Sequence, residues 1–426
     1  MKIDSIRVKN FKAFVEESFV FPSTFTAIIG DNATGKTSTL EALSIVLGTY
    51  LMGTKDVKYG LGGRKNRPLL KSEIRHQIMS PDNIEQQLPV EISAECCIDG
   101  SSYDWTRKQA NKQLTYKEAR DFIAYNEEQV CKLREGEEVT FPLIAYHGTG
   151  RLSNELLERA AYKKISSRLD GYYAALDPRS TKKQFIDWFK TYEDSILKFN
   201  KDRSLYDAFT EAVTTVIPEW NEIHFSWHLD ELVGQTEAGE WMAFSGLSDG
   251  YQAMLSLVAD LAYRCITLNP HLGKVAIKET AGVVLIDEID MHLHPKWQRH
   301  VVNDLKKAFP KVQFIVTTHS PFIVQSLKAD ELINLDEGSG EDPYKKSLED
   351  IVEDEMHVED VRRSAEFLKM QEVAGEYFEL LSSSNNENNV SQLSKLKNQL
   401  DELESKFSSD PAYVALMKAE RKSSGL

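Results

Sequence analysis

An eight-residue segment with two glycines limits what this chain can fold into more than any other feature. Residues 30–37 are Gly-Asp-Asn-Ala-Thr-Gly-Lys-Thr and match the pattern G-x-x-x-x-G-K-[ST]. An apolar run ends just before this segment, and apolar residues with helical spacing follow it in residues 35–48. A strand, a glycine loop and a helix in this order predict an α/β fold with a phosphate-binding loop, because the loop amides and the helix N-terminus point at an anion.

The residues of this segment divide into contacts with phosphate and a contact with magnesium. Lys36 is expected to reach the β- and γ-phosphates of ATP, and the hydroxyl of Thr37 is expected to ligate Mg²⁺. The alternative is a plain glycine turn before a helix, which the preceding apolar strand disfavours. The residues predicted to contact ATP are Gly30, Asn32, Gly35, Lys36 and Thr37 of this segment and Ser38, which follows it.

A second apolar run ends in two carboxylates. Residues 282–286 are followed directly by Asp287 and Glu288. A continuous apolar run of this kind is typical of a strand buried on both faces of a parallel sheet. An acidic pair at a strand end is common, but beside a phosphate-binding loop it has a specific interpretation. Asp287 is expected to hold Mg²⁺, and Glu288 is expected to polarise the attacking water.

The next apolar run, residues 312–316, ends in Thr-Thr-His-Ser at residues 317–320. A helix expected at about 295–309 separates it from the preceding strand, which predicts a βαβ unit with parallel strands. Ligands of open parallel sheets bind at the carboxyl ends of the strands. His319 is therefore predicted to stabilise or sense the γ-phosphate.

The charge composition excludes some classes of function. The chain has 426 residues with 51 basic and 66 acidic side chains, a net charge of −15. An acidic balance argues against a surface that coats nucleic acid broadly. Residues 330–360 contain 13 acids and two lysines, so this one stretch holds most of the excess and is expected to be a solvated face or a partner contact. No apolar run reaches the roughly 18 residues of a membrane span, and a cytoplasmic protein is expected.

Other segments have more local interpretations. The basic stretch at residues 55–76 is either a contact with a phosphate backbone or a solvated loop. Asp99-Gly100 predicts the turn of a β-hairpin. The apolar spacing of Leu393, Leu396, Leu400, Leu403 and Phe407 predicts an amphipathic helix.

A family resemblance is carried by two further segments. Residues 247–252, Leu-Ser-Asp-Gly-Tyr-Gln, resemble the signature motif of ABC-type ATPases of the RecF, SMC and OLD branch, and residues 287–295 resemble its Walker B motif and D-loop. The resemblance implies an α/β ABC-type P-loop head with a mixed sheet. It further implies that two such heads sandwich two ATP molecules between them. It also implies that Ser248 and Gly250 contact ATP held by a second subunit, and that Asp290 belongs to the catalytic residues.

The resemblance leaves several positions open. The family's Q-loop glutamine has no evident counterpart, and Arg151 stands near its expected place only as a candidate. Lys12 and Phe14, after the first strand, are candidate nucleotide contacts. His292 and His294 suggest a metal site at first sight, but the resemblance assigns their segment to the dimer contact.

Three hypotheses remain for what such an ATPase acts on. The first is a RecF-like ATPase of DNA repair and recombination. The second is an OLD-like enzyme with its own Toprim nuclease, suggested by residues 337–341. It is rejected because residues 332–335 fit the last strand of the head and no later strand ends in D-x-D.

The third hypothesis ranks first, because the layout resembles the PtuA family of ATPases from Septu and retron anti-phage defence systems. The resemblance includes residues 145–151, Ala-Tyr-His-Gly-Thr-Gly-Arg, and residues 410–421 near the end of the chain. It implies a homodimer or higher homo-oligomer and a separate HNH nuclease partner resembling PtuB. In retron versions it also implies a reverse transcriptase and its msDNA. No nuclease activity of the chain's own and no membrane partner are expected.

These features predict the organisation of the chain. Residues 1–151 and 222–336 are expected to form the two parts of one discontinuous ATPase head, with a helical insertion at 152–221 between them. Residues 337–389 are expected to be an acidic segment and linker, and residues 390–426 to be C-terminal helices that dock a partner, self-associate or pack on the head.

Overall fold

The computed structural model divides the chain into two compact units, Met1–Ile351 and Val352–Leu426. The structure describes residues 1–22, 24–54, 67–80, 83–110, 113–115, 117–152, 167–178, 182–217, 219–336, 338, 340–358, 365–382 and 390–407. Residues 55–66 of the basic stretch predicted at 55–76, residues 383–389 of the predicted linker and the predicted helix after residue 407 lie outside these ranges.

The centre of the first unit is a five-stranded sheet with the strand order β15-β3-β14-β13-β9. All four neighbouring pairs are parallel. Every residue of β3, β9, β13 and β14 is buried, as the continuous apolar runs predict. The strands are β3 Phe25–Ile29, β9 Leu143–His147, β13 Gly282–Ile286, β14 Val312–Thr317 and β15 Leu332–Asn334.

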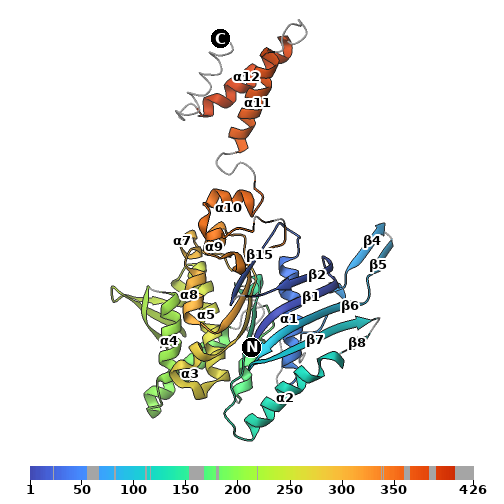
Figure 1. Cartoon of the computed structure of the whole chain (residues 1–426). Coiled ribbons are helices and arrows are strands. Elements are labelled where there is room, and N and C mark those ends of the chain that lie inside the picture. Colours follow the sequence, from blue (N-terminus) through green and yellow to red (C-terminus); the bar gives the residue numbers. More distant parts are fainter. Residues whose placement is uncertain are drawn as a thin grey trace. The chain divides into compact units, whose positions relative to one another are not determined.

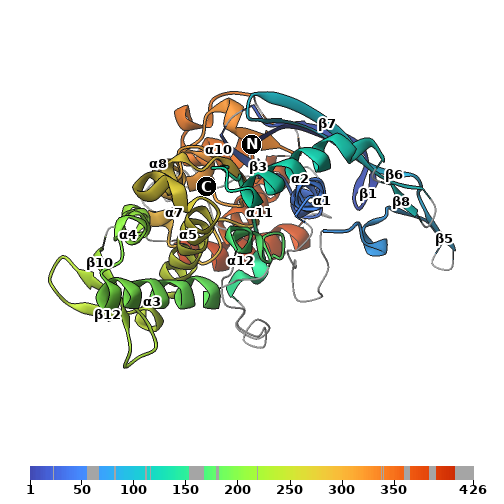
Figure 2. The same ribbon diagram turned by 90° about the horizontal axis from the view of Figure 1, so that it is seen from below.

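One face of this sheet is covered by helix α1 (Lys36–Leu51) and a second sheet. The second sheet is antiparallel with the order β2-β1-β6-β7-β8, and α1 packs against strands of both sheets (Figures 1 and 2). The five strands are β1 Lys2–Phe11, β2 Phe14–Val20, β6 Val90–Ile98, β7 Ser101–Ala110 and β8 Gln113–Thr115.

The predicted hairpin turn is confirmed. Asp99 and Gly100 join β6 to β7 and both have positive φ, 49° and 78°. Two successive residues with positive φ give a turn whose twist matches that of the strands, which is why Asp-Gly is favoured there.

The other face of the parallel sheet is covered mainly by helices. In Figure 1 this layer lies on the left, and its core includes the alternate strand side chains that point away from α1. A small antiparallel sheet, β10-β11-β12, belongs to the same layer. Its principal elements are α3 Lys182–Phe199, α4 Ser204–Val216, β10 Trp220–Ser226, β11 Glu231–Thr236, β12 Trp241–Ala243, α5 Asp249–Leu268 and α8 Val301–Ala308.

The helix predicted at 295–309 is present as two pieces. The short helix α7 (Pro295–Gln298) ends before α8 begins at Val301. The ring of Trp297 packs edge-on against the ring of Tyr251 of α5, with 4.4 Å between the ring centroids, which anchors the first piece separately from the second.

The chain also contains the strands β4 His76–Ser80 and β5 Asn83–Gln86 and the helices α2 Arg120–Arg134, α6 Ala276–Glu279, α9 Pro321–Val324 and α10 Leu348–Asp354.

The second unit contains two paired helices, α11 (Ala365–Ser382) and α12 (Val390–Phe407). The predicted amphipathic helix is confirmed as α12, and its Leu400 and Leu403 are buried against apolar side chains of α11. The leucine face of α12 is therefore occupied within the unit. No helix in the described part of the chain is long and apolar enough to cross a membrane.

Candidate nucleotide-binding site

The glycine loop lies between β3 and α1, at the carboxyl edge of the parallel sheet. Gly30 and Gly35 have φ values of +147° and +115°, which disfavour any residue with a side chain. A Cβ at Gly35 would lie 2.4 Å from Cζ of Phe14. Phe14 thus packs directly against the loop, and both backbone conformation and space require glycine at position 35.

The lysine of the loop is held by the loop itself. Nζ of Lys36 donates hydrogen bonds to the carbonyls of Gly30, at 2.7 Å, and Asp31, at 2.8 Å. Burial lowers the pKa of the Lys36 ammonium, while the carboxylates of Asp336 and Asp31 oppose that shift. The cation is therefore positioned inside the loop, with carbonyl oxygens as its partners.

Asp336 is a loop residue that the sequence analysis missed. Its Oδ2 accepts a hydrogen bond from the backbone N–H of Asp31 at 2.6 Å. Asp336 follows β15, the parallel neighbour of β3, so its place at the carboxyl end of a strand was a usable signal. One acid of the stretch at 330–360 thus contacts the glycine loop.

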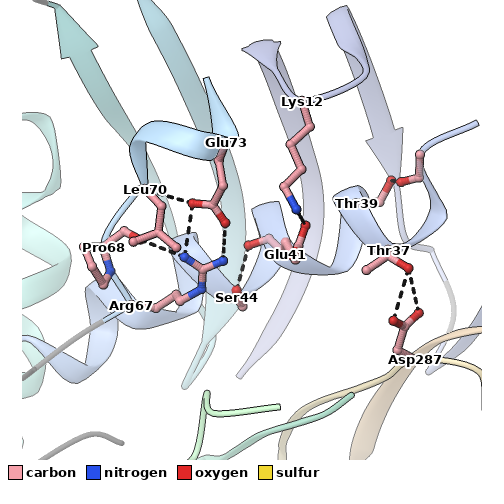
Figure 3. A network of polar contacts seen from close by, with 11 residues as sticks. Lys12, Thr37, Thr39, Glu41, Ser44, Arg67, Pro68, Leu70, Glu73 and Asp287 are labelled. Carbon is pink, nitrogen blue, oxygen red and sulfur yellow. Dashed lines mark hydrogen bonds and ion pairs between the residues drawn. The ribbon is translucent and has the colours of Figure 1, made fainter. Parts of the chain in front are cut away.

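The structure brings the two predicted magnesium ligands together. Oγ1 of Thr37 lies 3.1 Å from both carboxylate oxygens of Asp287 (Figure 3). Asp287 is only 4% exposed, and its Oδ1 also accepts a hydrogen bond from Thr317 Oγ1 at 2.7 Å. A hydroxyl and a carboxylate are hard oxygen donors of the kind that Mg²⁺ prefers, so this pair fits the ion.

Glu288 is placed by an unusual backbone conformation. Its φ is +48°, and its N–H donates to Oγ1 of Thr317 at 2.7 Å. Left-handed φ values are uncommon for residues with a side chain and concentrate at functional sites. Thr317 thus supports both carboxylate residues, although the sequence analysis assigned it no role.

The carboxylate of Asp290 contacts the end of β14. Its Oδ1 accepts hydrogen bonds from Thr318 Oγ1 at 2.6 Å and from the backbone N–H of His319 at 3.3 Å. The imidazole of His319 is exposed. Asp290 therefore holds the segment that carries His319, and Thr318 is a second hydroxyl residue of this motif whose role was missed.

The signature segment meets the D-loop of the same chain. Ser248 precedes the first residue of α5 and is exposed, and a Cβ at Gly250 would lie 2.4 Å from the carbonyl oxygen of His292. Glycine at position 250 therefore lets the backbone at His292 lie close to the first turn of α5. Within the described residues, no hydrogen bond joins Ser248 or Gly250 to the phosphate loop.

The remaining candidates lie as follows. Asn32 is exposed in the loop and Ser38 is half-buried in the first turn of α1. The Lys12 ammonium forms an ion pair with Glu41 of α1, which the close view also shows (Figure 3). Arg151 lies in a short 3₁₀ turn, Thr149–Leu152, and its side chain is outside the described part of the chain.

Two family models and several known proteins are similar to parts of this chain. A family model described as "AAA domain" matches residues 5–211, and another, "AAA domain, putative AbiEii toxin, Type IV TA system", matches residues 152–325. The chain is 26% identical to the "Retron Vc95 probable ATPase" of Vibrio cholerae serotype O1 biovar El Tor, over 78% of this chain and 73% of that protein. It is also 26% identical to the "Septu protein PtuA" of Bacillus thuringiensis, over 71% of this chain and 83% of that protein.

The chain is related to the PtuA and retron ATPases. A shorter match, 45% identical to the "Retron Ec83 probable ATPase" of Escherichia coli, covers 22% of this chain and 17% of that protein. The resemblance to these ATPases predicted from the sequence is thus confirmed, and so is the α/β fold with its parallel sheet. Among solved structures, the SMC head domain from Thermotoga maritima is 14% identical and matches 76% of this PtuA-like chain and 92% of that chain with a TM-score of 0.40.

Proposed function

We propose that this PtuA-like chain binds and hydrolyses ATP with Mg²⁺ and serves as the sensor or regulatory subunit of an anti-phage defence complex. The observation that carries the enzymatic part is the 3.1 Å approach of Thr37 to Asp287 beside a loop that already holds its lysine. The relationship to Septu and retron ATPases supports the defence context.

Each residue of the site has a proposed role in nucleotide binding. The phosphates of ATP replace the carbonyls of Gly30 and Asp31 as partners of Lys36, which gains a full anionic partner in place of two neutral ones. Thr37 and Asp287 would hold Mg²⁺ between them. When bound, the ion neutralises charge on the β- and γ-phosphates.

The proposed hydrolytic step uses groups at the ends of β13 and β14. The carboxylate of Glu288 orients and polarises the attacking water, and the exposed imidazole of His319 contacts the γ-phosphate. Asp290 contributes by fixing the 318–319 segment through its two hydrogen bonds. Of the three residues predicted to be catalytic, Asp290 thus acts through its neighbours.

The proposed active form is a head-to-head dimer. Ser248 is exposed at the start of α5 and has no hydrogen bond to the phosphate loop of its own chain within the described residues. An anion site at that helix start is suited to ATP held by a second copy. ATP then acts as a link between subunits, and hydrolysis loosens the assembly.

The proposed client is a separate HNH nuclease resembling PtuB, in some systems together with a reverse transcriptase and its msDNA. The test is co-expression of this chain with a PtuB-like HNH nuclease, followed by purification and a DNA-cutting assay with and without ATP. The proposal expects a complex whose cutting depends on ATP, and no cutting by this chain alone. A chain that forms no such complex and binds recombination proteins instead would support the RecF-like alternative.

A further inference from the structure

A buried polar network connects the central sheet to helix α5. His147 ends β9, and Asp260 and Arg264 lie one turn apart on α5; the three are 7%, 2% and 2% exposed. Nε2 of His147 lies 3.3 Å from Oδ2 of Asp260, which also accepts a hydrogen bond from Nε of Arg264 at 2.7 Å. Nη1 of Arg264 donates to the carbonyls of Gly171, at 2.8 Å, and Tyr173, at 3.0 Å.

The same histidine is joined to the proposed magnesium ligand through the backbone. His147 and Ile286 are partners in the parallel pair β9–β13, and the N–H of Asp287 donates to the carbonyl of His147 at 2.8 Å. The carboxylate of Asp287 in turn contacts Thr37. A continuous set of contacts therefore runs from α5, which begins just after Ser248, to the oxygen atoms that would face the ion.

A network of this kind is costly unless every charge in it is paired. Removing one partner of a buried ion pair leaves an uncompensated charge, whereas a complete network fixes its members in one geometry. Here Asp260 contacts both His147 and Arg264. A movement of α5 therefore shifts His147 or breaks the network.

We infer that His147, with Asp260 and Arg264, is a positioning residue that fixes Asp287 relative to α5 and so couples the signature end of that helix to the magnesium side of the site. The inference rests on the proposed function, because it needs Asp287 to be the residue that would hold Mg²⁺. The contact from His147 to Asp287 is the hydrogen bond that the His147 carbonyl accepts. It belongs to residues 145–151, the segment where the sequence left the Q-loop open and suggested Arg151 instead.

The test is the Mg²⁺ dependence of nucleotide binding by the full chain. A fluorescent ATP analogue is titrated into wild type, His147→Ala and His147→Gln, first in EDTA and then at increasing Mg²⁺. In EDTA, the affinity of each variant for the analogue should stay within about two-fold of the wild-type affinity. Mg²⁺ should raise the affinity, and His147→Ala should need about 10-fold more Mg²⁺ than wild type to reach half of that increase, as for other groups that support a metal ligand. His147→Gln keeps a polar side chain beside Asp260, so its Mg²⁺ requirement should lie between those of wild type and His147→Ala.

His271→Ala is the matched control. His271 lies in the segment after α5, where its Nδ1 is 3.3 Å from Arg168 and its Nε2 is 3.2 Å from Thr140, outside the contacts that link α5 to Asp287. Its Mg²⁺ dependence should equal that of wild type. If His147→Ala is poorly folded by circular dichroism, His147→Gln replaces it, and a smaller rise in Mg²⁺ requirement above wild type is expected.

Two results overturn the inference alone. One is a wild-type Mg²⁺ dependence in folded His147 variants, and the other is an equal loss of binding in EDTA and in Mg²⁺, which indicates general damage. If the wild-type chain itself binds no nucleotide under any condition, the proposed function fails and this inference fails with it.

Discussion

Thr37 Oγ1 lies 3.1 Å from both carboxylate oxygens of Asp287, although 250 positions separate the two residues in the chain. The approach follows from two parallel strands that end at the same edge of one sheet. It joins the start of α1 to the end of β13 with two oxygen ligands of the kind that Mg²⁺ prefers.

The first prediction concerns the loop lysine. Lys36→Ala should lower affinity for ATP by about 100-fold or more, because a charged hydrogen-bond donor to phosphate is worth several kcal/mol in a partly buried site. Isothermal calorimetry with a non-hydrolysable ATP analogue measures this. Lys311→Ala is the control, since Lys311 is an exposed lysine paired with Glu279. Equal affinity of wild type and Lys36→Ala would show that the loop is not the phosphate site.

The second prediction separates two glycines that are four positions apart. Gly250→Ala should destabilise the chain by about 1–3 kcal/mol, because the new Cβ would lie 2.4 Å from a backbone carbonyl that cannot move cheaply. Gly246→Ala is the control, since a Cβ there meets no atom within 4 Å. Urea unfolding compares them, and equal midpoints would contradict the close approach of the D-loop to α5.

The third prediction concerns pH and the pair of His224 on β10 and Glu193 on α3. Nδ1 of His224 lies 2.7 Å from Oε1 of Glu193, and this hydrogen bond raises the pKa of the half-exposed imidazole above its ordinary value of 6.5, although burial opposes the shift. A raised pKa in the folded state gives stability that is fully present below the unfolded pKa and is lost as pH rises through the folded pKa.

Urea unfolding of wild type and His224→Gln at pH 5.5 and pH 8.5 tests this pair. The wild type should be the more stable by up to about 1 kcal/mol at the lower pH, and the difference should shrink at the higher pH. A difference that grows with pH would contradict the assignment of the shift to Glu193.

The fourth prediction concerns the docking of a nuclease partner. The leucines of α12 are already packed against α11, so a deletion of residues 390–426 would expose that core and give an ambiguous result. Removing only residues 408–426 keeps the α11–α12 pair. The shorter chain should fold and hydrolyse ATP but should lose the nuclease in a pull-down, and an intact complex would place the docking surface elsewhere.

The sequence predicted those parts of the site that depend on local pattern. The glycine loop, the strands of the parallel sheet and the Asp99-Gly100 turn each follow from residues that are close together in the chain. Their physical causes, such as positive φ and continuous burial, act over a few residues and can be inferred without a structure.

The residues that were missed depend on contacts between distant segments. Asp336 accepts a hydrogen bond from Asp31, although 305 positions separate them in the chain. His147 contacts Asp260 and Asp287 because β9 pairs with β13 and packs against α5. Similarly, the leucine pattern of α12 predicts an apolar face, but the identity of α11 as its partner depends on the tertiary fold. Local patterns do not determine such pairings.

The measurement that tests the central claim most directly is phosphate release by purified wild type and Glu288→Gln, each with Mg²⁺ and with EDTA. The ATP affinity of both proteins and the mass of their assemblies in solution are measured alongside. Wild type should release phosphate only with Mg²⁺. Glu288→Gln should bind ATP with near wild-type affinity and remain a dimer while ATP is present. Its rate of phosphate release should be at most about one hundredth of the wild-type rate. Phosphate release by Glu288→Gln at the wild-type rate, or release that ignores EDTA, would contradict the account.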